Sequence, residues 1–215
     1  MTRSDGDHGD VTGRTYAPTS GVQPYYVLAA DELAERYESL TFEAVHKAIL
    51  RLLPDAPVRA VDIGAGTGRD AAAIAGLGHE VTAVEPVQEL RLVAQRLHTD
   101  APIVWLEDSL PDLERLDGEF GLILLSAVWM HLDDEERVVA MRRLAELLAV
   151  GGLLIISLRH GPPPADRRMF DVPADETAAL ARECGLCVLH VSGGQDQLGR
   201  GEIHWSELAL RKEQA

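Results

Sequence analysis

The chain has 215 residues, 46% of them hydrophobic, which fits one folded domain with a sizeable core and excludes a disordered chain. Its formal net charge of −15 would repel nucleic-acid phosphates, so we expect no nucleic-acid partner. No apolar run reaches the ~20 residues that span a bilayer, and the polar start lacks the apolar core of a signal peptide. We therefore expect no membrane partner and a cytoplasmic location.

The chain begins with a polar, glycine-rich stretch, residues 1–24, that predicts a mobile N-terminal segment. A single domain is expected over residues 25–215. From Asp31 to Leu53 apolar residues recur at helical spacing, which predicts one or two helices with Thr41 as an N-cap between them. We expect residues 25–56 to form a helical cap over a ligand bound by the rest of the domain.

After this segment, short apolar runs alternate with helical stretches. Strands are predicted at residues 58–64, 80–86, 102–108, 120–126, 153–159, 186–193 and 202–212. Helices are predicted at residues 69–78, 87–100, 133–152 and 173–185. This alternation, with nearly all-apolar inner strands, is typical of an α/β fold. We predict a Rossmann-like, doubly wound, seven-stranded sheet, mostly parallel, with helices on both faces.

The last two predicted strands are joined by about ten residues, too few for a parallel crossover. We therefore expect the sheet to end in an antiparallel hairpin, with an antiparallel last strand.

The first strand of this region ends in the sequence VDIGAGTGRD, residues 61–70. Gly64, Gly66 and Gly68 allow the turn to approach a ligand closely, and the helix that follows offers free N–H groups. Ligands of open α/β sheets bind outside the carboxyl ends of the strands. A dinucleotide fold would carry G-x-G-x-x-G, but Arg69 occupies the sixth position. A dinucleotide-dependent oxidoreductase is therefore an alternative with less support.

Three further polar residues end the next three strands. Glu85 follows the second strand and could accept hydrogen bonds from both hydroxyls of a ribose. Asp108 follows the third strand and could accept from an adenine amino group, and Ser126 ends the fourth strand beneath the ligand. Together these residues predict a nucleoside site without a pyrophosphate clamp.

With these motifs the sequence resembles the class I S-adenosylmethionine-dependent methyltransferases over residues 30–211. VDIGAGTG corresponds to the cofactor loop, VTAVEP to the ribose acid, LEDSL to the adenine acid and LILLSAVWMHL to the fourth strand. GTGRDAA, SAVWMHL and LRHGPPP resemble small bacterial members of mostly unassigned substrate.

The resemblance implies S-adenosyl-L-methionine as the cofactor. It implies that the glycine loop packs against the methionine part, with the acid at Asp62 reaching its ammonium group. The predicted cofactor-binding residues are Asp62, Gly64, Ala65, Gly66, Gly68, Arg69, Glu85, Pro86, Asp108, Ser109, Ser126 and Tyr37, the last of them either a lid contact or core packing.

Several absences restrict the reaction. No D/N-P-P-Y/F/W segment follows the fourth strand, no Pro-Cys pair offers a nucleophile, and no acid set suggests a metal, since Asp133 and Asp134 look like helix caps. A small-molecule methyltransferase is the leading interpretation. A non-catalytic binder of the cofactor, or an enzyme that rearranges it, is a further alternative. The sequence leaves a homodimer open.

The substrate side is expected in the N-terminal segment and in the loops after the fourth, fifth and sixth strands. Its aromatic and basic candidates are Tyr25, Tyr26, Tyr37, Trp129, His131, Arg159, His160, Arg167, Arg168 and Arg200. On so acidic a chain, the basic cluster favours a small anionic acceptor, methylated on oxygen or nitrogen. Alternatively, these arginines are solvated or paired with local acids.

Three residues are candidates for catalysis. Arg159 could hold an acceptor carboxylate, and His160, directly after the fifth strand, is the preferred general base. His131 is either structural or faces the methyl donor. We expect His46, His79 and His98 to be surface groups and His190 and His204 to be structural.

Overall fold

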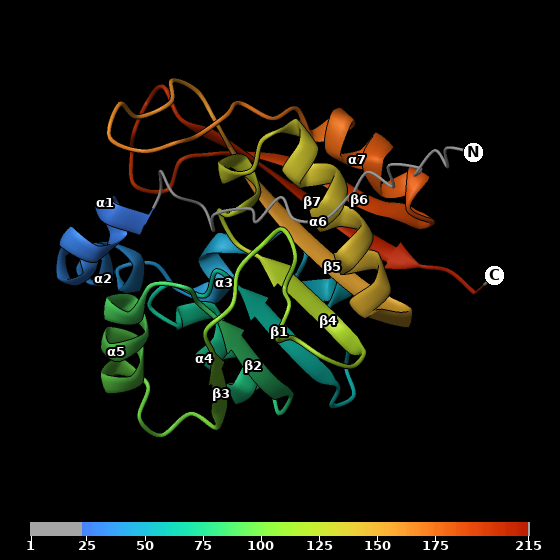
Figure 1. Ribbon diagram of the computed structural model, residues 1–215, viewed down its shortest axis with the longest axis horizontal. Coiled ribbons are helices and arrows are strands. Elements are labelled where there is room, and N and C mark those ends of the chain that lie inside the picture. Colours follow the sequence, from blue (N-terminus) through green and yellow to red (C-terminus); the bar gives the residue numbers. More distant parts are fainter. Residues whose placement is uncertain (1–22, 215) are drawn as a thin grey trace, which may run out of the picture.

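The computed structural model describes residues 23–214, so the predicted mobile segment lies almost entirely outside the described residues. Seven strands form one sheet in the order β3-β2-β1-β4-β5-β7-β6 (Figure 1). The strands are β1 (Arg59–Ile63), β2 (Glu80–Val84), β3 (Ile103–Leu106), β4 (Phe120–Leu125), β5 (Leu148–His160), β6 (Leu186–Gln195) and β7 (His204–Lys212). The first five pair in parallel, whereas β7 runs antiparallel to both β5 and β6. The predicted α/β sheet and its closing hairpin are confirmed.

Helices cover both faces of this sheet. They are α1 (Gln23–Leu28), α2 (Ala30–Glu38), α3 (Phe42–Val45), α4 (Arg69–Gly76), α5 (Gln88–Leu97), α6 (Asp134–Leu147) and α7 (Ala174–Glu183), with single 3-10 turns η1 (Leu50–Leu52) and η2 (Trp129–His131). The described helices include none with the length and apolar character needed to cross a bilayer.

Two apolar cores lie on opposite faces of the sheet. On one face, Met141 of α6 and Ala181 of α7 pack on strand residues such as Ile156. On the other face, Ile74 of α4 and Phe42 of α3 pack on residues such as Ile155. Successive residues of β5 thus point to opposite faces.

The capping predictions hold, although the helices are shorter than expected. The Thr41 hydroxyl accepts a hydrogen bond from the backbone N–H of Ala44 at 3.2 Å and starts α3. Asp133 caps α6 and forms a reciprocal capping box with Glu136. The stretch from Asp31 to Leu53 divides into α2, α3 and η1 rather than one or two long helices.

The boundary between α6 and β5 differs from the prediction. The helix was predicted to continue to residue 152, but it ends at Leu147, and β5 begins at Leu148 and continues to His160. Its far end is paired with β7 as far as His160 opposite His204, which keeps this segment extended. His160, predicted to follow this strand, therefore lies within it, as Arg159 does.

Candidate active site

A cavity of about 1020 Å³ opens at the carboxyl edge of the parallel strands. This volume is at the upper end for small-molecule sites and leaves room for two ligands side by side. The predicted site residues in its wall are Tyr26, Tyr37, Asp62, Gly64, Ala65, Gly66, Arg69, Glu85, Pro86, Asp108, Ser109, Ser126, His131, Arg159, Arg167 and Arg200. The cavity thus unites residues predicted from segments far apart in the chain.

The three loop glycines have positive φ angles of 70°, 56° and 84°, but they serve different purposes. A Cβ atom on Gly64 would lie 2.5 Å from a methyl group of Val128, and one on Gly68 would lie 3.0 Å from the Trp105 ring. At Gly66 the nearest atoms, from Tyr37, are 4.0 Å away. Packing therefore requires glycine at the two outer positions, and only at Gly66 does the missing side chain leave space in the cavity.

Glu85 is buried at the end of β2 and is tied to the glycine loop. Its carboxylate accepts hydrogen bonds from the backbone N–H of Gly66 at 2.8 Å and of Val87 at 2.9 Å. Burial raises the pKa of Glu85 to about 7, although both backbone donors oppose the shift. The group predicted to bind a ribose also fixes the loop beside it.

Asp62, at the end of β1, is almost completely buried, and its Oδ2 has no hydrogen-bond partner among the described residues. Burial, followed by the nearby charge of Asp70, raises the pKa of this carboxyl well above its usual range. A buried polar atom without a partner, beside a cavity, is a site for a ligand's donor group. A cationic group at this position would satisfy Asp62 and favour its ionised form.

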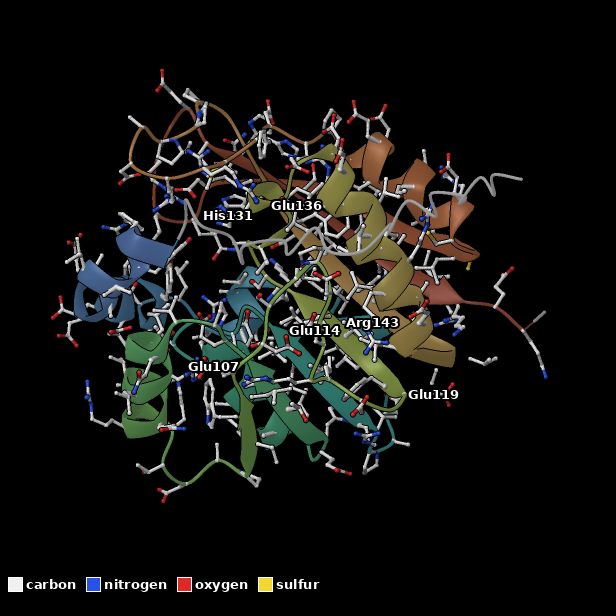
Figure 2. The ribbon with its side chains drawn as sticks, in the orientation of Figure 1. Glu107, Glu114, Glu119, His131, Glu136 and Arg143 are labelled. Atoms are coloured by element: carbon white, nitrogen blue, oxygen red, sulfur yellow. The ribbon has the colours of Figure 1, made fainter. Side chains whose placement is uncertain are left out.

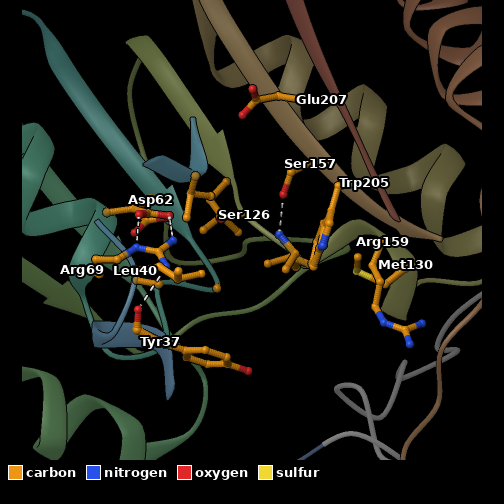
Figure 3. Close-up of a pocket in the computed structure, with 18 of the residues that line it drawn as sticks. Tyr37, Leu40, Asp62, Arg69, Ser126, Met130, Ser157, Arg159, Trp205 and Glu207 are labelled. Atoms are coloured by element: carbon orange, nitrogen blue, oxygen red, sulfur yellow. Dashed lines mark hydrogen bonds and ion pairs between the residues drawn. The ribbon is translucent and has the colours of Figure 1, made fainter. Parts of the chain in front are cut away.

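The other polar residues on this side are held by neighbouring backbone and charges. Asp108 accepts hydrogen bonds from the backbone N–H of Ser109 at 2.8 Å and of Arg115 at 2.7 Å. Arg69 lines the cavity, but its guanidinium is turned to Asp70, at 2.7 and 2.9 Å, and to the Tyr37 carbonyl (Figure 3). Its role is to join the start of α4 to the segment that ends α2.

The predicted basic cluster separates into paired and unpaired arginines. Arg200 forms a two-pronged ion pair with Asp196, and Arg168 pairs with Glu136 at 2.5 Å. No ion pair joins Arg159 or Arg167 to a carboxylate within the described part of the chain, and the Nε atom of each is buried without a hydrogen bond. Burial and the charges of Arg200 and Arg167 lower the pKa of Arg159. The cavity therefore contains unneutralised positive charge.

His131, in the turn after β4, faces the cavity at the edge of the sheet (Figure 2). Its Nδ1 donates to the Arg168 carbonyl at 2.8 Å, so Nε2 accepts from the Tyr26 hydroxyl at 3.2 Å. Burial and the nearby arginines lower the pKa of His131 to about 4, so the imidazole is neutral at physiological pH. His131 thus lies in the cavity wall with both ring nitrogens hydrogen-bonded.

His160 lies on the other face of β5 and is not part of the cavity wall. Its Nδ1 lies 3.0 Å from Asp171 and its Nε2 lies 2.9 Å from the Ser206 hydroxyl, so both nitrogens are engaged. The placement predicted for His160 is corrected: the strand continues through it, and alternation turns its side chain away from Arg159. His160 is therefore not placed to act as the base at this cavity.

Three more placements differ from the predictions. Trp129, expected on the substrate side, is fully buried in the core beside α6. His46, expected at the surface, is completely buried between Asp70 and Glu207, and His79 is also buried. The chain carries no local pattern that would pair His46 with groups 24 and 161 positions away.

The described residues hold no group of three or more acidic, histidine or cysteine side chains arranged for a metal ion.

Comparisons with known proteins agree with this geometry. A family model described as a methyltransferase domain matches residues 61–156. Ubiquinone biosynthesis O-methyltransferases of Xanthomonas campestris pv. campestris are 33% identical over 111 residues, which is 50% of this chain and 45% of the relative. The chain thus spans less than half the length of these curated relatives.

Solved structures share the fold over most of the chain. The 1,6-didemethyltoxoflavin-N1-methyltransferase of Burkholderia thailandensis, crystallised with S-adenosylhomocysteine, has a TM-score of 0.64 at 24% identity, covering 95% of this chain and 94% of that one. The magnesium protoporphyrin IX methyltransferase of Synechocystis PCC 6803, with bound SAM, has a TM-score of 0.60 at 14% identity, covering 94% and 86%.

Proposed function

We propose that this chain, whose residues 61–156 match the model of a methyltransferase domain, is a class I S-adenosylmethionine-dependent methyltransferase. In this proposal it transfers a methyl group from S-adenosyl-L-methionine to a small anionic acceptor, on oxygen or nitrogen. The observation that carries the acceptor class is the pair of arginines in the cavity wall that have no carboxylate partner among the described residues, Arg159 and Arg167. The family match removes the dinucleotide-dependent oxidoreductase as an alternative.

The residues of the cavity fit this cofactor. Asp62 has a buried oxygen without a partner and would bind the ammonium group of the methionine part. Glu85 would accept from the ribose hydroxyls with lone pairs that Gly66 and Val87 leave free. Asp108 would face the adenine edge, and the space at Gly66 would admit the methionine part. The helical segment 25–56 contributes Tyr26 and Tyr37 to the wall and is proposed as the cap.

When bound, S-adenosylmethionine supplies a sulfonium methyl group for in-line transfer. The protein's share is to align the acceptor and to exclude water, because transfer neutralises the sulfonium charge. Arg159 and Arg167 would orient the acceptor's anionic group. His131 is neutral, and its Nε2 accepts a hydrogen bond from the Tyr26 hydroxyl. It would therefore accept a proton from the acceptor by way of that hydroxyl.

Calorimetry with S-adenosylmethionine, S-adenosylhomocysteine and NAD tests the cofactor assignment. We expect both adenosyl compounds to bind and NAD not to bind. Binding of NAD alone would overturn the proposal. A protein that binds the adenosyl compounds but methylates none of a broad set of small acids would be a non-methylating binder.

We expect Glu85→Ala to weaken S-adenosylhomocysteine binding by about 1.5–3 kcal/mol, the range for hydrogen bonds to a charged group. In the wild type, affinity should fall as the pH falls through about 7, because the ionised carboxylate accepts from the ribose and its protonated form does not. Calorimetry between pH 5.5 and 8.5 checks both effects. Glu89→Ala, on the exposed part of α5, is the control. An unchanged affinity in Glu85→Ala would refute the ribose assignment.

Arg159→Ala should raise the acceptor's KM roughly tenfold with a smaller change in kcat, because it removes binding shared by ground and transition states. The cofactor's dissociation constant should stay the same. Arg182→Ala, at the end of α7 and away from the cavity, is the matched control. Steady-state kinetics on any acid that proves to be an acceptor gives the result. An unchanged KM would place the anion elsewhere in the cavity.

A further inference from the structure

One wall of the cavity, formed by β5 and β7, carries polar groups that the proposed function does not use. In the antiparallel pairing, Ser157 stands opposite Glu207 and Arg159 stands opposite Trp205. Residues opposite one another share a face of the sheet, and all four line the cavity. Arg159 and Trp205 therefore lie side by side, and Glu207 lies two residues farther along β7, as the labels in Figure 3 show.

Glu207 is a buried carboxylate with one oxygen bound and the other available. It is 8% exposed, and its Oε1 lies 2.5 Å from Nδ1 of His46. Within residues 23–214, no hydrogen bond reaches its Oε2. Because Glu207 lines the cavity and its side chain keeps some exposure there, this oxygen is accessible to a donor group of a ligand.

His46 holds this carboxylate in place from behind. It is completely buried, and its Nε2 lies 3.1 Å from Asp70 Oδ2, so the ring bridges the start of α4 and β7. Burial acts to lower the pKa of His46, but the hydrogen bonds and charges of Asp70 and Glu207 prevail and raise it to about 9. Both ring nitrogens therefore donate at neutral pH, and Glu207 stays a fixed acceptor.

Ser157 places this wall next to the cofactor side of the cavity. Its hydroxyl accepts a hydrogen bond at 2.9 Å from the backbone N–H of Ala127, the residue after Ser126. Glu207 is its cross-strand neighbour, and such pairs have Cβ atoms ~5 Å apart. A molecule that contacts Glu207 is therefore close to the region where the methyl group would be presented.

We propose that the acceptor carries an N–H or O–H group bound by Glu207, in addition to the anionic group bound by Arg159 and Arg167. Trp205 and Glu207 are two residues apart on one strand, ~7 Å, which is close to the span of one substituted aromatic ring. Trp205 is the cross-strand neighbour of Arg159, and its ring is fixed by an indole N–H bond to Asp196 at 2.9 Å. The acceptor class is thus a small, flat acid with an amino or hydroxyl substituent. This inference rests on the proposed function, and it makes His46 a positioning residue.

The test uses the protein saturated with S-adenosylhomocysteine and simple probes that differ only in the donor group. Calorimetry measures benzoate, 3- and 4-hydroxybenzoate, 3- and 4-aminobenzoate, and 4-(dimethylamino)benzoate, which has no N–H. We expect at least one hydroxy- or aminobenzoate to bind tenfold or more tightly than benzoate. The dimethylamino compound should lose that preference.

Variants then assign the preference to residues. Glu207→Gln should reduce the ratio of benzoate to aminobenzoate dissociation constants to about twofold or less, whereas Arg159→Ala should weaken every probe by the same factor. His46→Gln should reduce the ratio as well, since a misplaced carboxylate loses selectivity even in a folded protein. Glu202→Gln, an exposed glutamate of the β6–β7 turn, is the control and should keep the wild-type ratio.

The outcomes separate this inference from the function on which it depends. Equal binding of all probes by the wild type, or a full preference kept in Glu207→Gln, would overturn it. Binding of S-adenosylhomocysteine without any of the benzoates would also overturn it, while leaving the cofactor assignment intact. Failure of S-adenosylhomocysteine itself to bind would instead overturn the proposed function. If Glu207→Gln does not fold, the comparison of probes on the wild type still decides.

Discussion

Gly66→Val should weaken cofactor binding by roughly 100-fold or more, about 2.7 kcal/mol. A side chain at this position meets nothing closer than 4.0 Å in the protein, so its branches would project into the cavity where the methionine part would lie. A β-branched residue also resists the φ of 56° at this position. The resulting shift would displace the backbone N–H of residue 66, which donates a hydrogen bond to the Glu85 carboxylate. Calorimetry with S-adenosylhomocysteine measures the loss.

The control for this variant is Gly78→Val. Gly78 has a φ of 92°, and no atom lies within 4 Å of an added Cβ, but the residue is away from the cavity. The same backbone strain therefore arises without any obstruction of the site. We expect a similar decrease in melting temperature with wild-type affinity. Equal affinities in both variants would show that Gly66 does not face the cofactor.

The second large effect is on stability. His46→Ala should lower the free energy of unfolding by roughly 3–5 kcal/mol, because it leaves the buried carboxylates of Asp70 and Glu207 without their shared partner. His98→Ala, whose ring is partly exposed 3.4 Å from Glu38, is the matched control and should cost less than about 1 kcal/mol. Urea unfolding at pH 6.5 gives both values.

The effect of His46 should depend on pH in a defined direction. The pKa of His46 is raised from 6.5 to about 9 on folding, so its protonation stabilises the fold fully below pH 6.5. As the pH rises from 6.5 to 9, about 3 kcal/mol of this stabilisation is lost. The difference in unfolding free energy between wild type and His46→Ala should therefore shrink as the pH rises over this range. Asp62 and Arg69 also face the cluster, but both proteins contain them, so their titration does not distinguish the two. A difference that grows with pH would contradict the protonated bridge.

Local patterns in the sequence were sufficient to predict the fold and to predict that the residues proposed for the nucleoside lie in one cavity wall. The alternation of apolar runs with helical stretches predicted the α/β sheet, and the short final connection predicted its antiparallel hairpin. Glu85 directly follows β2, and Gly66 and Asp108 lie in the loops just after β1 and β3. The ends of parallel strands meet at one edge of the sheet. Their proximity follows from chain order alone, so no long-range packing information was needed.

The acceptor side depends on contacts that no local pattern encodes. Whether Arg159 or His160 faces the cavity depends on how far β5 extends, and that length is set by its pairing with β7. His46 and Glu207 are 161 positions apart and meet only because α3 packs over the β5–β7 face of the sheet. Which arginines remain unpaired depends likewise on neighbours from distant loops. Side-chain direction alternates with each strand residue, and burial is set by the opposite layer, so both are properties of the assembled sheet rather than of sequence spacing.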